Sequence, residues 1–409
     1  MKKIVFSFLF FVFAVGLFSQ EEQIENLTNL VKQLSSDEFA GRETGTEGQD
    51  KAAEYIIEKM TEIGLTPKGT DDSFLQEFEI TPKANPHMSE SQANGEPILV
   101  KNVIGYIDNR AEHTVIIGAH YDHLGMGGEG SLYVGDKEIH NGADDNASGV
   151  AILLQLASDL IGNENTASNN YLFIAFSGEE KGLWGSNYYC KNPTIELEQA
   201  NYMINMDMVG RLDETKGLAI NGVGTSPLWE EVLTETKVKE QELILSKSGV
   251  GPSDHTSFYL KEIPVLHFFT GQHEDYHKPT DDIEKINFKG MYLIGTYILD
   301  IIEHLDNKEK LEFVKTKDES AETPRFTVTL GVMPDYMFQG DGMRIDGVTE
   351  GKPADKAGFK TGDIVIKMGE IEVSDMMSYM KALSEFKKGD KTTVIVKRGK
   401  KEIKEKVEF

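Results

Sequence analysis

The sequence predicts an α/β domain built on a mostly parallel sheet, followed by a second, smaller domain. Short apolar runs rich in β-branched residues alternate with helical patterns over the first three quarters of the chain, which is typical of a sheet covered by helices on both faces. Charge is also uneven. Residues 320–409 hold 16 basic and 15 acidic residues, so the earlier part carries nearly all of the net charge of −26. Such a change in composition indicates a domain boundary.

Composition limits the classes of function and of metal site. The chain has 409 residues, of which 39% are hydrophobic, enough to form a core. Its net charge of −26 argues against a nucleic-acid binder, which needs a cationic surface. Cys190 is the single cysteine, so disulfides and cysteine-based zinc fingers are excluded. A metal site would have to be built from His, Asp and Glu.

The first 20 residues have the pattern of a secretory signal peptide. Lys2 and Lys3 precede an apolar run over residues 4–18, and a cleavage zone near Ser19 follows. The run is shorter than the roughly 20 residues that span a bilayer, and no later stretch is long and apolar enough. We therefore expect a cleaved signal peptide over residues 1–20, a secreted or periplasmic protein, and no stable membrane anchor.

The acidic part begins its regular pattern with a strand and a helix. Residues 114–119 read T-V-I-I-G-A, a β-branched run that predicts a buried strand ending before H-Y-D-H. Residues 147–160 repeat apolar side chains at three- and four-residue spacing, which predicts a helix. Together they form the first strand–helix pair of the predicted sheet.

Three more strands and one helix complete the predicted domain. Residues 171–176, Y-L-F-I-A-F, predict a buried strand that runs into S-G-E-E. Residues 202–208 and 263–269 are also strand-like, and residues 288–305 have the pattern of a long amphipathic helix. No internal repeat is evident in the sequence.

Polar clusters occur at the ends of these elements. His120 and Asp122 follow the first strand, and an acidic pair at 179–180 follows the second. Residues 144–146 open a helix, Asp207 ends another strand, and His277 precedes the last helix. Because ligands of open α/β sheets bind beyond the carboxyl ends of the strands, we expect these side chains to converge. Two His and several carboxylates suit zinc or a similar divalent ion.

Six motifs in chain order resemble those of the family-28 zinc metallopeptidases. They are G-A-H-Y-D-H, G-A-D-D-N-A-S-G, S-G-E-E, N-M-D-M-V-G, G-P-S-D-H-T-S-F and Y-H-K-P-T-D, and an earlier A-G-R-E-T-G-T-E-G at residues 40–48 also fits. The resemblance runs from about residue 30 to residue 305. It implies a co-catalytic dinuclear-zinc exopeptidase, in most members an aminopeptidase, on an α/β fold with a mixed central sheet, here over residues 21–305.

The resemblance also implies the metal ligands. His120 and Asp207 would bind one zinc ion, Glu180 and His277 would bind the other, and Asp145 would bridge the two. A bridging carboxylate suits this role because it can give one oxygen to each ion of a two-metal site. The implied cofactor is therefore two Zn²⁺ ions per chain.

Three further residues would assist catalysis by the same resemblance. Glu179 would be the general base, Tyr276 would offer its hydroxyl to the developing oxyanion, and Asp122 would hold the imidazole of the first histidine ligand. The peptide bond between Asp145 and Asn146 is often cis in this family.

Other polar residues near the motifs are expected to have supporting roles. Asp254 and His255 lie in G-P-S-D-H-T-S-F, a motif that we expect to shape the rim of the substrate pocket. His123 and His267 are expected to be structural or rim residues rather than ligands. Arg42 would serve a turn that packs beside the site.

Residues 325–409 resemble a PDZ domain of the kind appended to bacterial secreted proteases, and the charged segment 306–324 suits a linker. The most specific stretch is P-A-D-K-A-G-F-K-T-G-D at residues 353–363. Residues 330–332 would lie near the carboxylate-binding loop, where an extended peptide adds a strand to the sheet. The implied partner is a peptide or protein C-terminus. The alternative is that this domain only packs on the peptidase or tunes access to its site.

The sequence therefore predicts a secreted dinuclear zinc aminopeptidase that acts on peptides with a free N-terminus, and three rivals stay open. A carboxypeptidase for acidic C-termini would want an arginine cluster, but the peptidase part has only Arg42, Arg110 and Arg211. A glutaminyl cyclase would use one zinc and would not need the second set of ligands. A non-catalytic peptide-binding protein would be expected to have lost ligands or the base, and all of these positions are filled.

Overall fold

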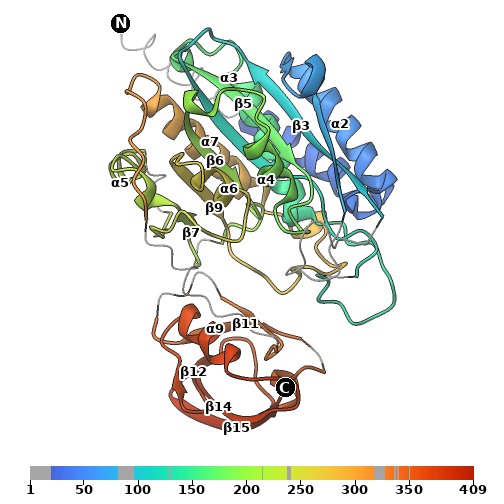
Figure 1. Cartoon of the computed structure of the whole chain (residues 1–409), viewed down its shortest axis with the longest axis vertical. Coiled ribbons are helices and arrows are strands. Elements are labelled where there is room, and N and C mark those ends of the chain that lie inside the picture. Colours follow the sequence, from blue (N-terminus) through green and yellow to red (C-terminus); the bar gives the residue numbers. More distant parts are fainter. Residues whose placement is uncertain are drawn as a thin grey trace, which may run out of the picture.

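The computed structural model describes residues 20–81, 96–128, 130–213, 215–236, 241–316, 328–335, 338, 340–349 and 351–409. Figure 1 shows that the chain folds into a larger N-terminal body and a smaller C-terminal one. Apart from residue 20, the predicted signal peptide lies outside the described residues. Among the helices of the described ranges, none combines the length and the apolar character that crossing a membrane requires.

The larger body is built on a nine-stranded mixed sheet, as expected. Its centre consists of four parallel strands in the spatial order β5 (Asn169–Phe176), β4 (His113–His120), β6 (Ala200–Met206) and β9 (Val265–Phe269). Antiparallel strands extend the sheet beyond β5: β3 (Ile98–Ile107), β2 (Leu75–Ile80) and β1 (Thr66–Pro67). Beyond β9 lie the antiparallel β7 (Leu218–Asn221) and then β8 (Leu243–Leu245).

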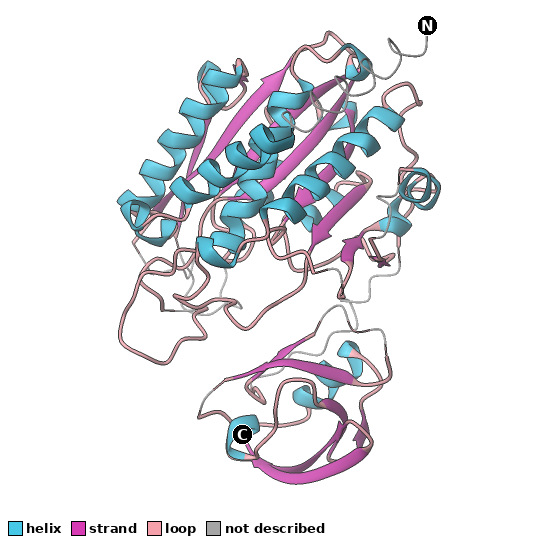
Figure 2. Cartoon of the chain, turned by 180° about the vertical axis from the view of Figure 1, so that it is seen from behind, coloured by secondary structure: helices cyan, strands magenta, loops and turns pink. Residues whose placement is uncertain are grey.

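Helices cover both faces of this sheet, as Figures 1 and 2 show. One face carries α2 (Glu47–Ile63), α3 (Gly149–Leu160), α5 (Trp229–Glu235) and α7 (Phe288–Leu305), and the other carries α4 (Trp184–Lys191) and α6 (His255–Tyr259). Each face of the sheet has its own hydrophobic core: the first lies under α2, α3, α5 and α7, and the second under α4 and α6. Side chains alternate along β4, so Val115 and Ile117 enter the first core and Ile116 enters the second. Because both faces are buried, the central strands read as continuous apolar runs in the sequence.

The six predicted elements are confirmed, with small shifts at their ends. The helix α7 has the predicted bounds, and β9 begins two residues later than predicted. The strand β6 ends at Met206, so Asp207 lies just beyond the sheet rather than in the strand. The helix α3 begins at Gly149 because Asp145 and Asn146 have non-helical backbone angles in the π-type turn before it.

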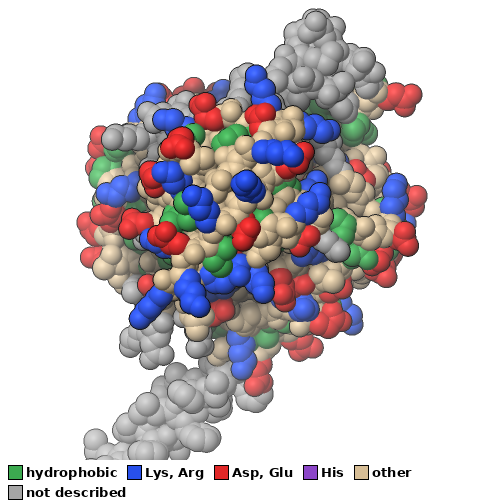
Figure 3. Space-filling view, turned by 90° about the horizontal axis from the view of Figure 1, so that it is seen from below, with side chains coloured by type: hydrophobic (Ala, Val, Ile, Leu, Met, Phe, Trp, Pro, Cys, Tyr) green, Lys and Arg blue, Asp and Glu red, His purple; other side chains and the backbone are tan. Residues whose placement is uncertain are grey.

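The smaller body has an antiparallel six-stranded sheet with its own core, which confirms the β-rich second domain. Its elements are β10 (Val332–Pro334), β11 (Met343–Val348), α8 (Pro353–Lys356), β12 (Ile364–Met368), β13 (Ile371–Glu372), α9 (Met376–Ser384), β14 (Lys391–Arg398) and β15 (Lys401–Glu408). Figure 3, seen from below, shows Lys and Arg interspersed with Asp and Glu. This mixture agrees with the nearly even charge balance of the C-terminal part.

The buried carboxylate of Asp363 explains the G-D pair in the PDZ-like stretch. It accepts hydrogen bonds from Nε and Nη2 of Arg398, each at 2.7 Å, and from the backbone N–H of Lys360 at 2.9 Å. A bidentate pair of this kind fixes geometry as well as adding energy. Arg398 thereby joins β14 to the turn that precedes β12.

The segment after α7 packs on the larger body. Leu311 is 3% exposed. The N–H of Val314 donates to the carbonyl of Thr225 at 2.8 Å, and the N–H of Thr316 donates to the hydroxyl of Tyr259 at 3.1 Å. Residues 311–316 of the expected linker are therefore part of the packed structure, whereas residues 317–327 lie outside the described residues.

Candidate active site

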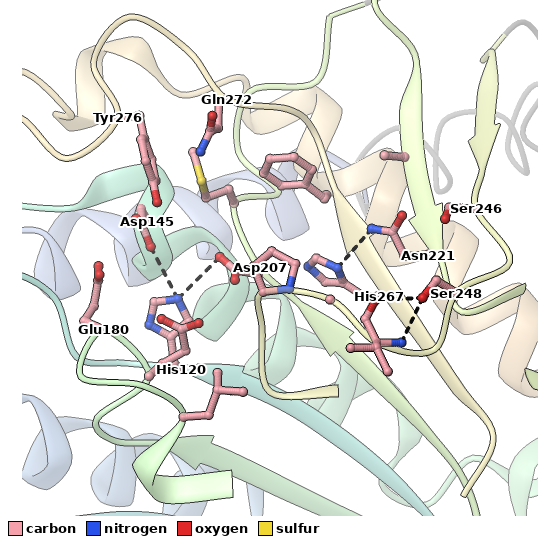
Figure 4. Close-up of a pocket in the computed structure, with 18 of the residues that line it drawn as sticks. His120, Asp145, Glu180, Asp207, Asn221, Ser246, Ser248, His267, Gln272 and Tyr276 are labelled. Atoms are coloured by element: carbon pink, nitrogen blue, oxygen red, sulfur yellow. Dashed lines mark hydrogen bonds and ion pairs between the residues drawn. The ribbon is translucent and has the colours of Figure 1, made fainter. Parts of the chain in front are cut away.

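The predicted ligands meet at the carboxyl edge of the parallel strands. His120 is the last residue of β4, Asp207 follows β6, and Glu180 lies in the loop after β5. Asp145 comes from the turn before α3, and His277 comes from the loop between β9 and α7. The structure brings all five side chains together, and Figure 4 shows four of them with the cavity that they line.

The five side chains form two groups that share Asp145. In one group, Nε2 of His120 lies 3.3 Å from Oδ1 of Asp145 and 3.3 Å from Oδ1 of Asp207. In the other, Nε2 of His277 lies 3.3 Å from Oδ2 of Asp145 and 3.3 Å from Oε2 of Glu180. The two oxygens of Asp145 therefore face different groups, which is the orientation that a bridging carboxylate needs.

Hydrogen bonds between side chains and the backbone fix the turn that carries Asp145. The N–H groups of Asp144 and Asp145 both donate to Oδ2 of Asp281 at 3.0 Å. Nδ2 of Asn146 donates to the carbonyl of Met206 at 3.0 Å, and the peptide bond between Asp145 and Asn146 is cis, as the resemblance implied. Sequence reasoning missed this role of Asp281, because its partners are 136 and 137 residues away along the chain.

Each predicted histidine ligand is held through its second ring nitrogen. Nδ1 of His277 lies 2.8 Å from the carbonyl oxygen of Gly130. Nδ1 of His120 lies 3.2 Å from the carbonyl oxygen of Asp122 and 3.6 Å from its Oδ1. These contacts place the proton on Nδ1 and leave Nε2 free for a metal ion. Asp122 also accepts a hydrogen bond from the N–H of Glu179 at 3.1 Å, so it contacts both a predicted metal ligand, His120, and the predicted general base.

Glu179 lies beside the two groups and lines the same cavity. Desolvation raises the pKa of its carboxyl well above the ordinary value, the charges of Asp207 and Glu180 add to the rise, and His120 opposes it. Desolvation also disfavours ionisation of Asp145, but hydrogen bonds to histidines hold the pKa of that carboxyl well below its usual range. Glu179 is therefore suited to exchange a proton, whereas Asp145 is suited to stay ionised.

Tyr276 presents a neutral hydroxyl to the cavity. Its ring packs on His277 with the centroids 3.8 Å apart, and Figure 4 shows its hydroxyl pointing toward Asp145. Burial raises the pKa of this hydroxyl well above the ordinary value, and the charges of Asp145 and Glu180 add to the rise. The group is therefore available as a hydrogen-bond donor to a substrate.

His123, which we expected to be a structural or rim residue, belongs to the second group. The side chain is fully buried, and its Nδ1 lies 2.8 Å from Oε1 of Glu180 and 3.9 Å from Oδ2 of Asp145. In the sequence, the signal is a second histidine at the end of H-Y-D-H. That signal alone does not separate a ligand from an ordinary loop residue.

Arg42 supports the site from behind, as expected. It is buried, and its guanidinium donates to four backbone carbonyls, those of Leu34, Tyr121, Asn141 and Gly142. Burial lowers the pKa of this guanidinium to about 10, and nearby carboxylates, Asp145 foremost, oppose the shift. The A-G-R-E-T-G segment is thereby tied to the loops that lead to two of the ligands.

In the G-P-S-D-H-T-S-F motif, Gly251 and Pro252 line the cavity, as expected of this motif, whereas Asp254 and His255 lie behind the cavity wall. Both side chains are 0% exposed. The ring of His255 stacks on His267 with the centroids 4.5 Å apart, and His267 lines the cavity. The physical reason is that α6 begins at His255 and buries Phe258 in the second core, which turns this segment inward.

The cavity has a volume of about 580 Å³ and opens onto both groups. Figure 4 shows Asn221, Ser246, Ser248 and His267 across it from Glu180 and Tyr276. Among the described residues that line it there is no Lys or Arg. Met380, in α9 of the smaller body, also lines the cavity.

The donor set fits a pair of zinc ions. Imidazole nitrogens and carboxylate oxygens are ligands that zinc accepts. Within the described part of the chain, such atoms lie within 4.8 Å of one another in two clusters, His120–Asp145–Asp207 and His123–Asp145–Glu180. His277 joins the second cluster through its contacts with Asp145 and Glu180. Buried carboxylates gathered this closely need compensating positive charge.

Comparisons with known proteins agree with this geometry. The family model described as Peptidase family M28 matches residues 102–302, and that of the PDZ domain matches residues 312–409. Aminopeptidase YwaD of Bacillus subtilis (strain 168) is 29% identical over 207 residues, which are 48% of this chain and 42% of that protein. Leucine aminopeptidase 1 of Uncinocarpus reesii is 28% identical over 207 residues, 46% of this chain and 51% of that protein. The chain thus spans about half the length of these curated relatives.

Solved structures share the fold at low sequence identity. BSAP, a zinc aminopeptidase from Bacillus subtilis, superposes with a TM-score of 0.54 at 19% identity, covering 71% of this chain and 95% of its own. A glutaminyl cyclase from Porphyromonas gingivalis superposes with a TM-score of 0.55 at 18% identity, covering 69% and 98%. At these identities the likeness shows the fold alone.

Proposed function

We propose, from the premise that residues 102–302 form a peptidase family M28 domain and residues 312–409 a PDZ domain, that the protein is a secreted dinuclear zinc aminopeptidase. It removes N-terminal residues from peptides, with Glu179 as the general base. The observation that carries the proposal is the orientation of Asp145, whose two carboxylate oxygens face two different groups of ligands.

The proposed metal ligands follow from these two groups. His120 and Asp207 would hold one zinc ion, Glu180 and His277 would hold the other, and Asp145 would bridge them. When bound, such a pair supplies Lewis-acid polarisation of the scissile carbonyl and acidifies water in the site.

Proton transfer falls to Glu179 in this proposal. Its carboxyl has a raised pKa and lies in the cavity, so it can take a proton from the attacking water and give it to the leaving amine. The neutral hydroxyl of Tyr276 donates to the oxygen on which negative charge develops. Asp122 keeps the ring of His120 and the backbone of Glu179 in place.

The charge of the cavity favours a substrate with a free N-terminus. Glu180 and Asp207 are proposed zinc ligands, and the bound ions would offset their charge. Glu179 is then the carboxylate in the described lining that remains for the ammonium group of a substrate. The described lining has no Lys or Arg to pair with a terminal carboxylate, and Arg211 pairs with Asp275 instead. These features favour an aminopeptidase over a carboxypeptidase.

The other two rivals are also less well supported. Both ligand pairs are present, whereas a glutaminyl cyclase would need one zinc. A non-catalytic binding protein would not need Glu179 in the cavity with a raised carboxyl pKa.

Hydrolysis of a panel of aminoacyl anilides by the mature protein tests the proposal. We expect the wild type to release the anilide, and Glu179→Gln to keep its zinc while kcat/KM falls about 10²- to 10⁴-fold. Glu43→Gln is the matched control, because Glu43 pairs with Lys181 at 3.0 Å and does not line the cavity. Zinc-loaded protein that hydrolyses no substrate with a free N-terminus would overturn the proposal.

Export is the second part of the proposal. The pattern of residues 1–20 supports a cleaved signal peptide. Expression of the full chain with analysis of cell fractions tests it. We expect the protein outside the cytoplasm with its N-terminus near Ser19, and an uncleaved cytoplasmic chain would contradict export.

The PDZ domain is proposed to bind a peptide or protein C-terminus beside residues 330–332. The carbonyl of Leu330 accepts a hydrogen bond from the N–H of Ala354 at 2.8 Å, and Gly331 has the positive φ of 76° that a tight loop requires. Met380 supports an additional role for this domain in tuning access to the site, because this residue is among those that line the cavity.

A further inference from the structure

One wall of the catalytic cavity is polar but carries no formal charge. Asn221 ends β7, Ser246 and Ser248 follow β8, and His267 lies in β9. Asn221 and His267 are opposite each other in the antiparallel pair of β7 and β9. Figure 4 shows these four side chains on the far side of Asp207 from Glu180. We call this set the polar wall. The proposed chemistry gives it no role.

The polar wall has a buried hydrogen-bond donor without a partner. Nδ2 of Asn221 donates to Nδ1 of His267 at 3.1 Å, so the neutral ring carries its proton on Nε2. Burial lowers the pKa of His267 to about 4, against the opposing charge of Asp207, which keeps the ring neutral at neutral pH. Within the described residues Nε2 has no hydrogen-bond partner, although the side chain is only 3% exposed. Such a group in a native protein calls for a partner.

The rest of the lining on this side is apolar or small. Ala219 and Phe269 are paired in the same two strands as Asn221 and His267, and the ring of Phe269 lies 6.0 Å from that of His267. Met208 and Pro252 also line the cavity. A side chain bound here would therefore meet apolar surface along its stem and hydrogen-bonding groups at its end. Outside the ligand groups and Glu179, the described lining has no charged residue. A charged side chain would lose its hydration without gaining a counter-charge.

We infer that the polar wall is the subsite for the first side chain of the substrate, and that it selects uncharged side chains that form hydrogen bonds, namely those of Asn, Gln, Ser and Thr. The inference rests on the proposed aminopeptidase function and adds the substrate class. Nε2–H of His267 donates to the side-chain oxygen of the substrate, and the oxygen of Asn221 accepts its N–H or O–H. Oγ of Ser248 donates to the carbonyl of Val250 at 2.9 Å and accepts from its N–H at 3.2 Å, so one lone pair of this oxygen is left for the substrate. A leucine of the same size would leave Nε2–H of His267 unpaired, which is how a site built for hydrogen bonds rejects an apolar analogue.

Pairs of substrates with matched shapes test this inference on the zinc-loaded wild type. Asparagine is compared with leucine and threonine with valine, each as the aminoacyl anilide. We expect kcat/KM to be at least about tenfold higher for the polar member of each pair. Equal or faster cleavage of the leucine and valine substrates would overturn the inference and leave the aminopeptidase proposal intact. Failure to cleave any of the four would instead contradict the aminopeptidase function itself.

Variants locate the selectivity in the polar wall. Asn221→Leu and, separately, Ser248→Ala should each lower the asparagine-to-leucine ratio of kcat/KM, the first by about tenfold or more. Gln272→Leu is the matched control, because Gln272 lines the cavity on the side of Tyr276 (Figure 4). Its ratio should match that of the wild type. Because each ratio is measured on one protein sample, partial misfolding cancels, and an unchanged ratio in Asn221→Leu would overturn the assignment.

Discussion

Nδ1 of His123 lies 2.8 Å from Oε1 of Glu180, one of the two oxygens of this carboxylate. His277 contacts the other oxygen, Oε2, at 3.3 Å. The two histidines thus divide the two oxygens of one carboxylate between them. In this arrangement His123 orients Glu180, and Oε2 is directed toward the proposed second zinc ion.

His123 should strengthen the binding of this second zinc ion. His123→Leu should weaken binding of one zinc ion about 10- to 100-fold and leave the other unchanged, because the partner that orients Glu180 is lost. His123→Asn should restore part of the affinity, since its Nδ2 can donate from nearly the same position as Nδ1. Competitive zinc titration of the metal-free protein measures both sites.

The control for this titration is His140→Leu. His140 contacts Ser131 and Glu138 rather than a predicted ligand, so both zinc affinities should stay at the wild-type values. Equal weakening of both sites in His123→Leu, or no change at either, would contradict an orienting role for His123.

Arg42 is predicted to contribute strongly to stability. Arg42→Met would leave four backbone carbonyls, three of them buried, without their donor, and we expect the free energy of unfolding to fall by at least about 3 kcal/mol. Arg110→Met, at an exposed loop position, should change it by less than about 0.5 kcal/mol. Denaturant unfolding compares the two variants, and similar losses in both would refute this account of Arg42.

The buried, neutral side chain of His267 should contribute a loss of stability as pH drops from 6.5 toward 4. In the unfolded chain His267 takes up a proton near its ordinary pKa of 6.5, whereas burial lowers the pKa of the folded side chain to about 4. The folded state therefore binds fewer protons in this window. The stabilisation is fully present above pH 6.5 and is lost as pH falls, by up to about 3 kcal/mol.

Replacing the histidine tests this dependence. His267→Gln should flatten the slope of unfolding free energy against pH between 6.5 and 4. The half-buried His304, which pairs with Glu235 at 3.2 Å, provides the control His304→Gln. If His267→Gln keeps the wild-type slope, the titration of this buried ring is not its source.

The central strands and the ligand positions could be predicted from the sequence because each has a local signal. The apolar run of β4 ends directly at His120, and the parallel arrangement places that end beside the ends of β5 and β6. The strand β6 ends two residues before its predicted end, because the apolar Met208 beyond Asp207 continues the strand-like pattern in the sequence.

Other parts of the site depend on contacts that have no local signal. Asp281 accepts hydrogen bonds from residues far away along the chain, and His123 is a single histidine in a loop. The strand β7 has four residues, too few for a clear alternation. Its pairing with β9 brings Asn221 to His267, so the polar wall exists only in the folded protein.

The zinc content of the mature protein, measured by native mass spectrometry, tests the central claim most directly. We predict two zinc ions per wild-type chain and one per chain in His277→Ala, because the group of His120 and Asp207 stays complete in that variant. A single zinc ion, or none, in freshly purified wild type would contradict the dinuclear site.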